Sequence, residues 1–254
     1  MSPLMEEIAE QRRLLDRKVL RYSFDFSQYY HRWFNRQLLA LLDPSPDLRV
    51  LDCGCGTGVL LPALARRRQR SIGLDLSLDN LAVARAASRA LVVGDVNALP
   101  LAHQCFDHII CRGVLHHVPD IERGFRQLFA IAKDGGDLVV AEPVRNTPVH
   151  GLRVMAKLCS ATTLTSAQWI EAAQAAGFQM VRWFPIGYLA FPLLGYPEMS
   201  YVFRYAPFRM PLARFLLRVD RLIERLPFVR AWSWQAVFHF KKPDHGAGRG
   251  LVDQ

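Results

Sequence analysis

The 254-residue sequence lacks a regular disulfide framework. It has five cysteines, an odd number at irregular spacing, and this makes a poor disulfide framework. The opening residues mix charges and contain no apolar stretch of the kind that marks a secretory signal. We therefore expect reduced thiols and a cytoplasmic protein.

Long hydrophobic runs are also missing from the sequence. The longest apolar stretch, IGYLAFPLLGYP from Ile186, is far shorter than the roughly 20 residues of a membrane-spanning helix and contains prolines. There are no repeats and no low-complexity tracts. Because 51% of the residues are hydrophobic and 22% are charged, the composition is typical of a globular protein.

The net charge of +9 is unevenly distributed along the chain. The segment from Ser200 to Lys242 contains nine Lys and Arg residues but only two acidic ones. A basic surface attracts anionic partners such as nucleic acid or an anionic membrane. We therefore expect any electrostatic partner to meet the C-terminal part of the chain.

Short apolar runs alternate with helical patterns through the middle of the sequence. This alternation predicts an α/β fold whose mostly parallel sheet is covered by helices on both faces. Two later strands, separated by a long insertion, would form a pair at one edge and bring the sheet to seven strands. The predicted strands are 48–53, 70–76, 90–95, 106–113, 136–143, 179–186 and 234–243, and the helices between them are 58–68, 77–88, 120–132 and 165–176.

The pattern divides the chain into a core with helical additions. We expect an N-terminal helical flap (1–45), a ligand-binding core (46–187), a helical cap insertion (188–232), a final core strand (233–243) and a tail (244–254). Aromatic residues of the flap and the cap would form an apolar lid over a substrate pocket: Trp33, Phe34, Trp183, Tyr188, Phe191, Tyr196 and Tyr201.

The cap contains one amphipathic segment, residues 210–229, with two open interpretations. Arginines 214, 218, 221 and 225 lie towards one side, and an apolar face lies on the other. The apolar face could pack inside the cap, or it could rest on an anionic membrane with the arginines beside it. The expected apolar face consists of Leu212, Phe215, Leu216, Val219, Leu222, Ile223 and Leu226.

The most informative stretch is VLDCGCGTG, from Val50 to Gly58. Cys53 and Cys55 have no further thiol or imidazole ligands nearby, so we expect no metal site. Glycines after a buried strand let the backbone turn sharply and approach a ligand closely. The dinucleotide fingerprint is incomplete, since Val59 stands where its third glycine is expected.

Taken with three later motifs, this loop resembles the class I S-adenosylmethionine-dependent methyltransferases. The other motifs are GLDLS with Asp75, GDVNALPL with Asp95, and FDHIICRGVLHHVPD, in the order and at the spacing of that family. The resemblance runs from about residue 22 to residue 184. It implies a Rossmann-like methyltransferase fold, S-adenosylmethionine as cofactor and methyl transfer as the reaction.

The resemblance also implies a cofactor site. Asp75, some twenty residues after the glycines, would accept the ribose hydroxyls, although it could instead cap the following helix. Asp95 would accept from the adenine amino group or cap a turn, and Asp52 would orient the methionine end. The expected cofactor-binding residues are Asp52, Gly54, Cys55, Gly56, Asp75, Leu76, Asp95, Val96 and Arg112.

The acceptor side is less specified by the sequence. A general base is needed only if the acceptor loses a proton as it attacks, and the candidates are His116, His117 and Tyr30. The aromatic lid favours a hydrophobic small-molecule or lipid-like acceptor. A nucleic-acid acceptor is the alternative that the charge allows, but RGVLHH replaces the turn of amino-methylating nucleic-acid enzymes. A non-catalytic cofactor-binding module is the other alternative.

Overall fold

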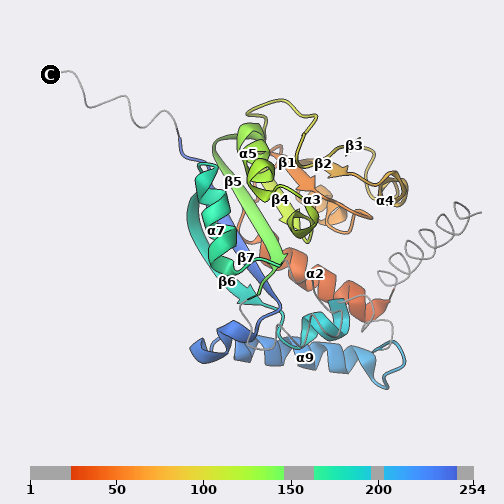
Figure 1. The fold of residues 1–254 in the computed structure, drawn as a ribbon. Helices are drawn as coiled ribbons and strands as arrows, with labels where there is room; N and C mark the ends of the chain where they lie inside the picture. Colours follow the sequence, from red (N-terminus) through yellow and green to blue (C-terminus); the bar gives the residue numbers. More distant parts are fainter. Residues whose placement is uncertain (1–23, 146–162, 196–202, 245–254) are drawn as a thin grey trace, which may run out of the picture.

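A computed structural model of the chain describes residues 24–145, 163–195 and 203–244, and it shows one seven-stranded sheet (Figure 1). The strand order is β3-β2-β1-β4-β5-β7-β6. Strands β1 to β5 are parallel, whereas β7 runs antiparallel between β5 and β6. The predicted sheet and its edge pair are thus confirmed. The strands are β1 (Arg49–Cys53), β2 (Arg70–Asp75), β3 (Leu91–Val93), β4 (Phe106–Arg112), β5 (Ala132–Pro143), β6 (Gln179–Ile186) and β7 (Gln235–Lys241).

The four helices predicted between the strands occur in the predicted order and lie inside the predicted ranges. Thr165 caps the helix that begins at Ser166: its hydroxyl accepts the N–H of Gln168, and the side-chain oxygen of Gln168 accepts the N–H of Thr165. Among the described residues, the α-helices are α2 (Asp25–Leu39), α3 (Leu61–Arg66), α4 (Leu78–Ala84), α5 (Ile121–Ile131), α7 (Ser166–Ala175) and α9 (Arg209–Ile223). The other helical turns are η1 (Leu115–His117), η2 (Phe191–Gly195) and η3 (Pro227–Trp232).

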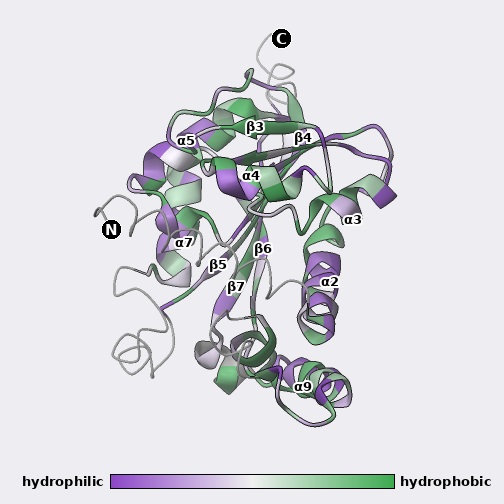
Figure 2. Ribbon diagram, turned by 90° about the vertical axis from the view of Figure 1, so that its right-hand side faces the viewer, coloured by the Kyte–Doolittle hydropathy of each residue, from purple (hydrophilic) through white to green (hydrophobic). Residues whose placement is uncertain are grey.

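Two apolar layers cover the sheet, one on each face (Figure 2). Alternate strand residues such as Val50 and Ile110 pack against α2, α3 and α9. Their neighbours, such as Leu51 and Ile109, pack against α5 and α7. Strands with apolar residues on both faces read as nearly continuous hydrophobic runs, which is why the sequence predicts them well.

Helix α9 is attached to the core by a buried carboxylate. Asp220 is fully buried and accepts the backbone N–H groups of Tyr188, Leu189 and Ala190 at 3.1, 2.8 and 3.1 Å. At the start of the helix, Arg209 pairs with Asp25 of α2 at 3.1 Å. These bonds hold α9 against α2 and fix its rotation about its own axis.

The orientation of α9 corrects one prediction about the cap. We expected Phe215, Leu216 and Leu222 on one packed or inserted face, but Leu216 packs inward while Phe215 and Leu222 are each 60% exposed. The inward face consists of Ala213, Leu216, Leu217 and Asp220. The reason is that Asp220 has to face the 188–190 backbone, which turns Phe215 and Leu222 to the outside.

The predicted aromatic lid is also different from the observed packing. Trp33, Phe34 and Tyr188 are buried. Trp33 and Phe34 lie on the inner face of α2 and belong to the apolar layer between α2 and the sheet. Trp183 on β6 stacks on Phe238 with ring centroids 6.1 Å apart. Tyr196, Tyr201, residues 1–23 of the predicted flap and most of the predicted tail lie outside the described residues. Within the described ranges, no helix is both long and apolar enough to span a membrane.

We expect Asp220→Ala to detach the cap, because three buried N–H groups would lose their acceptor. The loss should be about 2–4 kcal/mol in the free energy of unfolding, measured by urea titration. Asp220→Asn is the matched control, since its amide oxygen can still accept, and it should lose clearly less. An alanine variant as stable as the wild type would show that Asp220 does not anchor α9.

Candidate functional site

The glycine loop leaves β1 and turns back over the end of β2. The N–H groups of Gly54 and Cys55 both donate to the carbonyl of Leu74, at 2.7 and 2.9 Å. Gly54 has φ +72°, and a Cβ there would come within 2.3 Å of Val114. At Gly56 (φ +53°) nothing lies within 4 Å of a Cβ position, so the loop has an open side that a ligand could approach.

Cys55 belongs to this loop through its backbone. Its side chain is buried, and its sulfur lies close to the backbone of Gly73 on β2. Burial raises the pKa of the Cys55 thiol well above its usual range, so the sulfur is a packing group rather than a nucleophile. The described residues contain no group of three or more His, Cys, Asp or Glu side chains that could hold a metal ion.

Asp75 lies at the carboxyl end of β2, next to the glycine loop. Its Oδ2 accepts the N–H of Gly56 at 2.8 Å, and its Oδ1 accepts from Ser77 N and Asn80 Nδ2 at 2.9 and 3.1 Å. The capping of α4 falls to Ser77, whose hydroxyl accepts the N–H of Asn80. Asp75 therefore ties the glycine loop to the start of α4 while its carboxylate stays at the open edge.

Asp52 is a buried acid without a hydrogen bond to one of its oxygens. It is 2% exposed, and its Oδ2 has no hydrogen-bond partner within the described ranges. Burial raises the pKa of Asp52 to about 7; the positive charge of Arg112 acts against this rise and the negative charge of Asp75 adds to it. An orphaned buried carboxyl is costly unless a cation or donor meets it. The α-ammonium group of S-adenosylmethionine fits this requirement.

Arg112, at the end of β4, points towards α2. Its guanidinium donates to Asn35 Oδ1 at 2.8 Å, bonds to His31 Nδ1 and lies 4.8 Å over the ring of Phe34. The amide of Asn35 donates in turn to the carbonyl of Val59, which directly follows the glycine loop, at 3.1 Å. Arg112 thus fastens α2 beside the loop, a contact that the sequence did not reveal.

The predicted adenine-side residues follow β2 and β3, which are adjacent parallel strands. Leu76 is 70% exposed, whereas Val96 is buried. Asp95 is exposed, and its Oδ1 accepts the N–H of Asn97 at 2.8 Å, which is the turn-capping role expected as an alternative. Since parallel strands end at one edge, these residues and Asp75 lie along the same edge of the sheet.

A buried glutamate at the end of β5 organises the loop after β4. Glu142 is fully buried, and its Oε1 accepts the N–H groups of Val114 and Leu115, each at 2.8 Å. Its Oε2 lies 2.6 Å from His116 Nδ1. Burial lowers the pKa of His116, but the charge and hydrogen bond of Glu142 outweigh that effect and leave it raised. The sequence analysis missed Glu142; the signal was a single acid in the apolar run LVVAEP.

The other two base candidates have different surroundings. His117 is exposed, and its ring centroid lies 3.9 Å from that of His116. Tyr30 is fully buried against Trp33 and Gly195, and its hydroxyl has no hydrogen-bond partner in the described part of the chain. Burial raises the pKa of Tyr30, so its phenol stays protonated at any physiological pH.

Comparison with known proteins identifies a domain in this chain. Residues 51–140 match the family described as "Methyltransferase domain". The demethylmenaquinone methyltransferase of Corynebacterium efficiens is 34% identical over 118 residues, which are 46% of this chain and 50% of the relative. The ubiquinone biosynthesis O-methyltransferase of Chromobacterium violaceum is 30% identical over 155 residues, 51% of this chain and 66% of the relative. The chain spans about half the length of the first of these relatives.

A solved structure supports the fold. An S-adenosylmethionine-dependent methyltransferase from Mesorhizobium loti superposes with a TM-score of 0.57 at 20% identity, covering 82% of this chain and 96% of that one. The predicted doubly wound methyltransferase fold is confirmed. Residues 51–140 are a methyltransferase domain, as the motifs predicted, and S-adenosylmethionine-dependent small-molecule methyltransferases are its homologues.

Proposed function

We propose that this chain binds S-adenosylmethionine at the carboxyl edge of the sheet and transfers its methyl group to a hydrophobic, quinone-like acceptor. The observation that carries the proposal is the pair of carboxylates, Asp52 and Asp75, on either side of an open glycine loop in a chain of this family. The relatives named above include a demethylmenaquinone methyltransferase and a ubiquinone biosynthesis O-methyltransferase. Their names support a quinone-like acceptor and leave the methylated atom open.

The cofactor-binding roles follow from the positions of the side chains. Asp75 would accept the ribose hydroxyls, and Asp52 would meet the α-ammonium group, for which its unpaired Oδ2 is suited. The backbone of Gly54, Cys55 and Gly56 would contact the methionine end. On the adenine side, Leu76 and Val96 would lie against the ring and Asp95 would accept from its amino group. Arg112 would hold α2 beside the glycine loop, and its positive charge would favour the ionised form of Asp52.

His116 is the base that the geometry favours. The bound cofactor supplies a methyl group on a sulfonium, so its departure needs no acid from the protein. If the acceptor is a hydroxyl or a ring carbon, it loses one proton, and a nearby base accelerates the transfer. Because Glu142 bonds Nδ1 of His116, it favours the tautomer with Nδ1–H, whose lone pair is on Nε2. His117 is exposed, and Tyr30 is buried and protonated.

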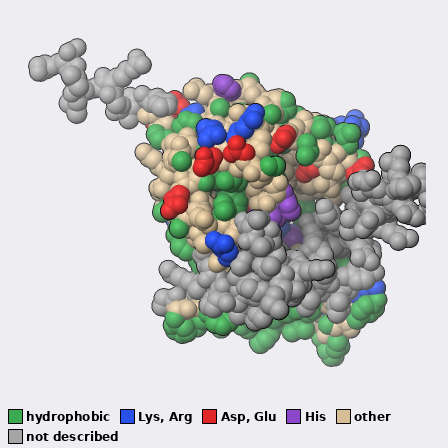
Figure 3. All heavy atoms as spheres, in the orientation of Figure 1, with side chains coloured by type: hydrophobic (Ala, Val, Ile, Leu, Met, Phe, Trp, Pro, Cys, Tyr) green, Lys and Arg blue, Asp and Glu red, His purple; other side chains and the backbone are tan. Residues whose placement is uncertain are grey.

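The exposed side of the cap supports contact with a membrane. Phe208, Phe215, Leu222 and Phe228 are 60–83% exposed, and they form a surface that we call the apolar ridge. Hydrophobic side chains gather along the lower edge in Figure 3, where α9 lies in Figure 1. Beside the ridge, exposed arginines 214, 218, 221 and 225 follow α9 at three- and four-residue spacing. An apolar face flanked by arginines is suited to the interface of an anionic bilayer, where a lipid-soluble acceptor resides.

The first prediction from the proposed function concerns proton release when the cofactor binds. Since Asp52 has a pKa of about 7, roughly half of these groups are protonated at pH 7, and a bound ammonium group would favour the carboxylate. Binding of S-adenosylhomocysteine should then release up to about half a proton at pH 7, more at pH 6 and almost none at pH 8.5. Calorimetry in buffers of different ionisation enthalpy measures this release.

Asp52→Asn should abolish that proton release and weaken binding by about 1.5–3 kcal/mol, the usual cost of losing a charged hydrogen bond. His116→Gln is the control, because it removes a titratable histidine from the same edge and should leave the Asp52 release in place. Equal release from the wild type and Asp52→Asn would remove Asp52 from the cofactor site.

The second prediction tests the base with a reduced, isoprenoid-tailed demethylmenaquinone as acceptor and S-adenosylhomocysteine as the product measured. His116→Gln should lower kcat by about 10²–10⁴. Glu142→Gln can still accept the two N–H groups but presents an amide to Nδ1, which favours the tautomer with its proton on Nε2. It should lower kcat while S-adenosylhomocysteine affinity stays unchanged.

His117→Gln is the matched control and should retain most of the activity. If His117→Gln loses as much as His116→Gln, or if Glu142→Gln is fully active, His116 is not the base. A wild type that binds the cofactor but produces no S-adenosylhomocysteine with any quinol would favour the non-catalytic binding module.

The third prediction tests the apolar ridge by liposome flotation. Binding should rise with the fraction of anionic lipid and fall between 50 and 500 mM salt, because surface attraction is screened over about 8 Å at physiological ionic strength. Phe215→Ser with Leu222→Ser, and separately Arg218→Gln with Arg225→Gln, should each weaken it. Arg123→Gln with Arg126→Gln on α5 changes the net charge equally and should have little effect. No flotation at low salt would leave the ridge without a membrane role.

A further inference from the structure

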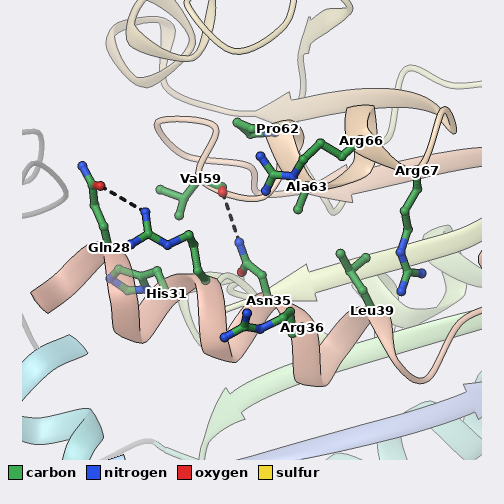
Figure 4. A pocket seen from close by; sticks show the side chains of 11 residues that line it. Gln28, His31, Asn35, Arg36, Leu39, Val59, Pro62, Ala63, Arg66 and Arg67 are labelled. Carbon is green, nitrogen blue, oxygen red and sulfur yellow. Dashed lines mark hydrogen bonds between the residues drawn. The ribbon is translucent and has the colours of Figure 1, made fainter. Parts of the chain in front are cut away.

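A basic groove lies between α2 and α3 on the outer side of the glycine loop. It encloses about 620 Å³, and Figure 4 shows its side chains projecting from two facing walls. Asp52, Asp75 and Glu142 do not line it, so it is separate from the proposed methyl-transfer site. Its lining residues are Gln28, His31, Arg32, Asn35, Arg36, Leu39, Val59, Pro62, Ala63, Arg66 and Arg67.

Four arginines give this groove its charge. Arg32 and Arg36 lie one turn apart on α2, and Arg66 and Arg67 come from the end of α3 opposite them. Among the described residues, no acidic side chain lines the groove. Since arginine stays protonated in proteins, four positive charges face a cavity of this size.

No carboxylate in the described part of the chain pairs with these four arginines. Within residues 24–145, 163–195 and 203–244, none of the four arginines forms an ion pair, whereas Arg70, Arg126 and Arg209 each do, at 3.4, 3.6 and 3.1 Å. Arg32 donates to the side-chain oxygen of Gln28 at 3.3 Å, a neutral acceptor. The cluster therefore keeps its full positive charge.

Arg67 adds an unsatisfied donor to this charge. Its Nη1 is buried and has no hydrogen-bond partner in the part of the chain that the structure describes. Burial also lowers the pKa of Arg67, which reflects the cost of removing the guanidinium from water. A buried donor without an acceptor is rare, and an anion is the group that would satisfy it.

We propose that this groove binds a phosphorylated small molecule, and this proposal does not rest on the proposed methyl transfer. Guanidinium groups match phosphate oxygens with two parallel hydrogen bonds, and arginines on both walls could hold one phosphate or two linked ones. The groove also has apolar lining residues, against which the rest of the molecule would lie: Leu39, Val59, Pro62 and Ala63. The volume is in the range of small-molecule sites.

Inorganic pyrophosphate is the probe that tests the phosphate chemistry. We expect the full chain to bind it at 50 mM salt in isothermal titration calorimetry, and Arg36→Gln with Arg66→Gln to weaken binding at least about tenfold, since each arginine contributes charge-assisted bonds. Arg123→Gln with Arg126→Gln on α5 removes two exposed positive charges elsewhere and should change the affinity less than about twofold. Hydrogen exchange should slow in residues 28–39 and 59–67 when pyrophosphate is added.

Flotation with vesicles containing phosphatidic acid separates a free phosphate from a lipid headgroup. If the Arg36→Gln with Arg66→Gln variant loses as much flotation as the ridge variants do, the bound phosphate belongs to a lipid. If its flotation is unchanged while its pyrophosphate binding is weakened, the phosphate belongs to a soluble ligand. Affinity for S-adenosylhomocysteine should be the same in all variants, which keeps this test independent of the methyl-transfer proposal.

Three results would overturn the proposal. One is the absence of pyrophosphate binding at about 1 mM by a folded wild type. Another is equal weakening by the groove pair and the α5 pair, which would indicate diffuse charge alone. The third is binding of a short RNA, but not of pyrophosphate, that the groove pair abolishes, since this would make the groove part of a nucleic-acid surface.

Discussion

Arg112 brings a positive charge to a place where carboxylates crowd together. Asp52 and Asp75 end adjacent strands, and with no counter-charge their burial and mutual repulsion would oppose the loop between them. The same guanidinium bonds to Asn35 and His31, so the charge that stabilises the edge also fixes α2 there. An unpaired buried charge costs several kcal/mol, so the glycine loop and α2 depend on this one side chain together.

Glu142 has the corresponding role on the other half of the edge. One of its oxygens accepts two backbone N–H groups of the loop after β4, and the other bonds to the imidazole of His116. The Glu142 side chain is fully buried. A carboxylate used in this way gives a surface histidine a fixed orientation and a fixed tautomer. The edge therefore has one acid whose Oδ2 is left without a partner, Asp52, and one whose bonds are complete, Glu142. The first is suited to bind a cation, and the second to position a base.

The fold could be predicted from the sequence because its strands are buried on both faces. The runs that contain Val50, Ile110 and Val139 are apolar at nearly every position, and the helices between them have the 3.6-residue period. The rotation of α9 could not be predicted. An amphipathic pattern shows how wide an apolar helix face is, but not which residues of that face pack against the core. In α9 the hydrogen bonds of Asp220 determine which residues face the core.

The candidate site was predictable only where a motif carried it. Asp75 and the glycines stand at family spacing, so their positions at one edge follow from the topology of the sheet. The bonds from Arg112 to Asn35 and from Glu142 to His116 join residues 77 and 26 positions apart. No local pattern specifies such pairs, although an acid within an apolar strand signals that it has a buried partner.

Helix α2 lies between two places where ligands are proposed to bind. Asn35 is bonded on one side to Arg112, at the cofactor edge, and on the other to Val59, in the wall of the basic groove. An anion that changes the position of α2 would also move the counter-charge of Asp52. Linkage is reciprocal, so the cofactor would then have to change the anion's affinity by the same factor. A single asparagine would make the two equilibria thermodynamically inseparable.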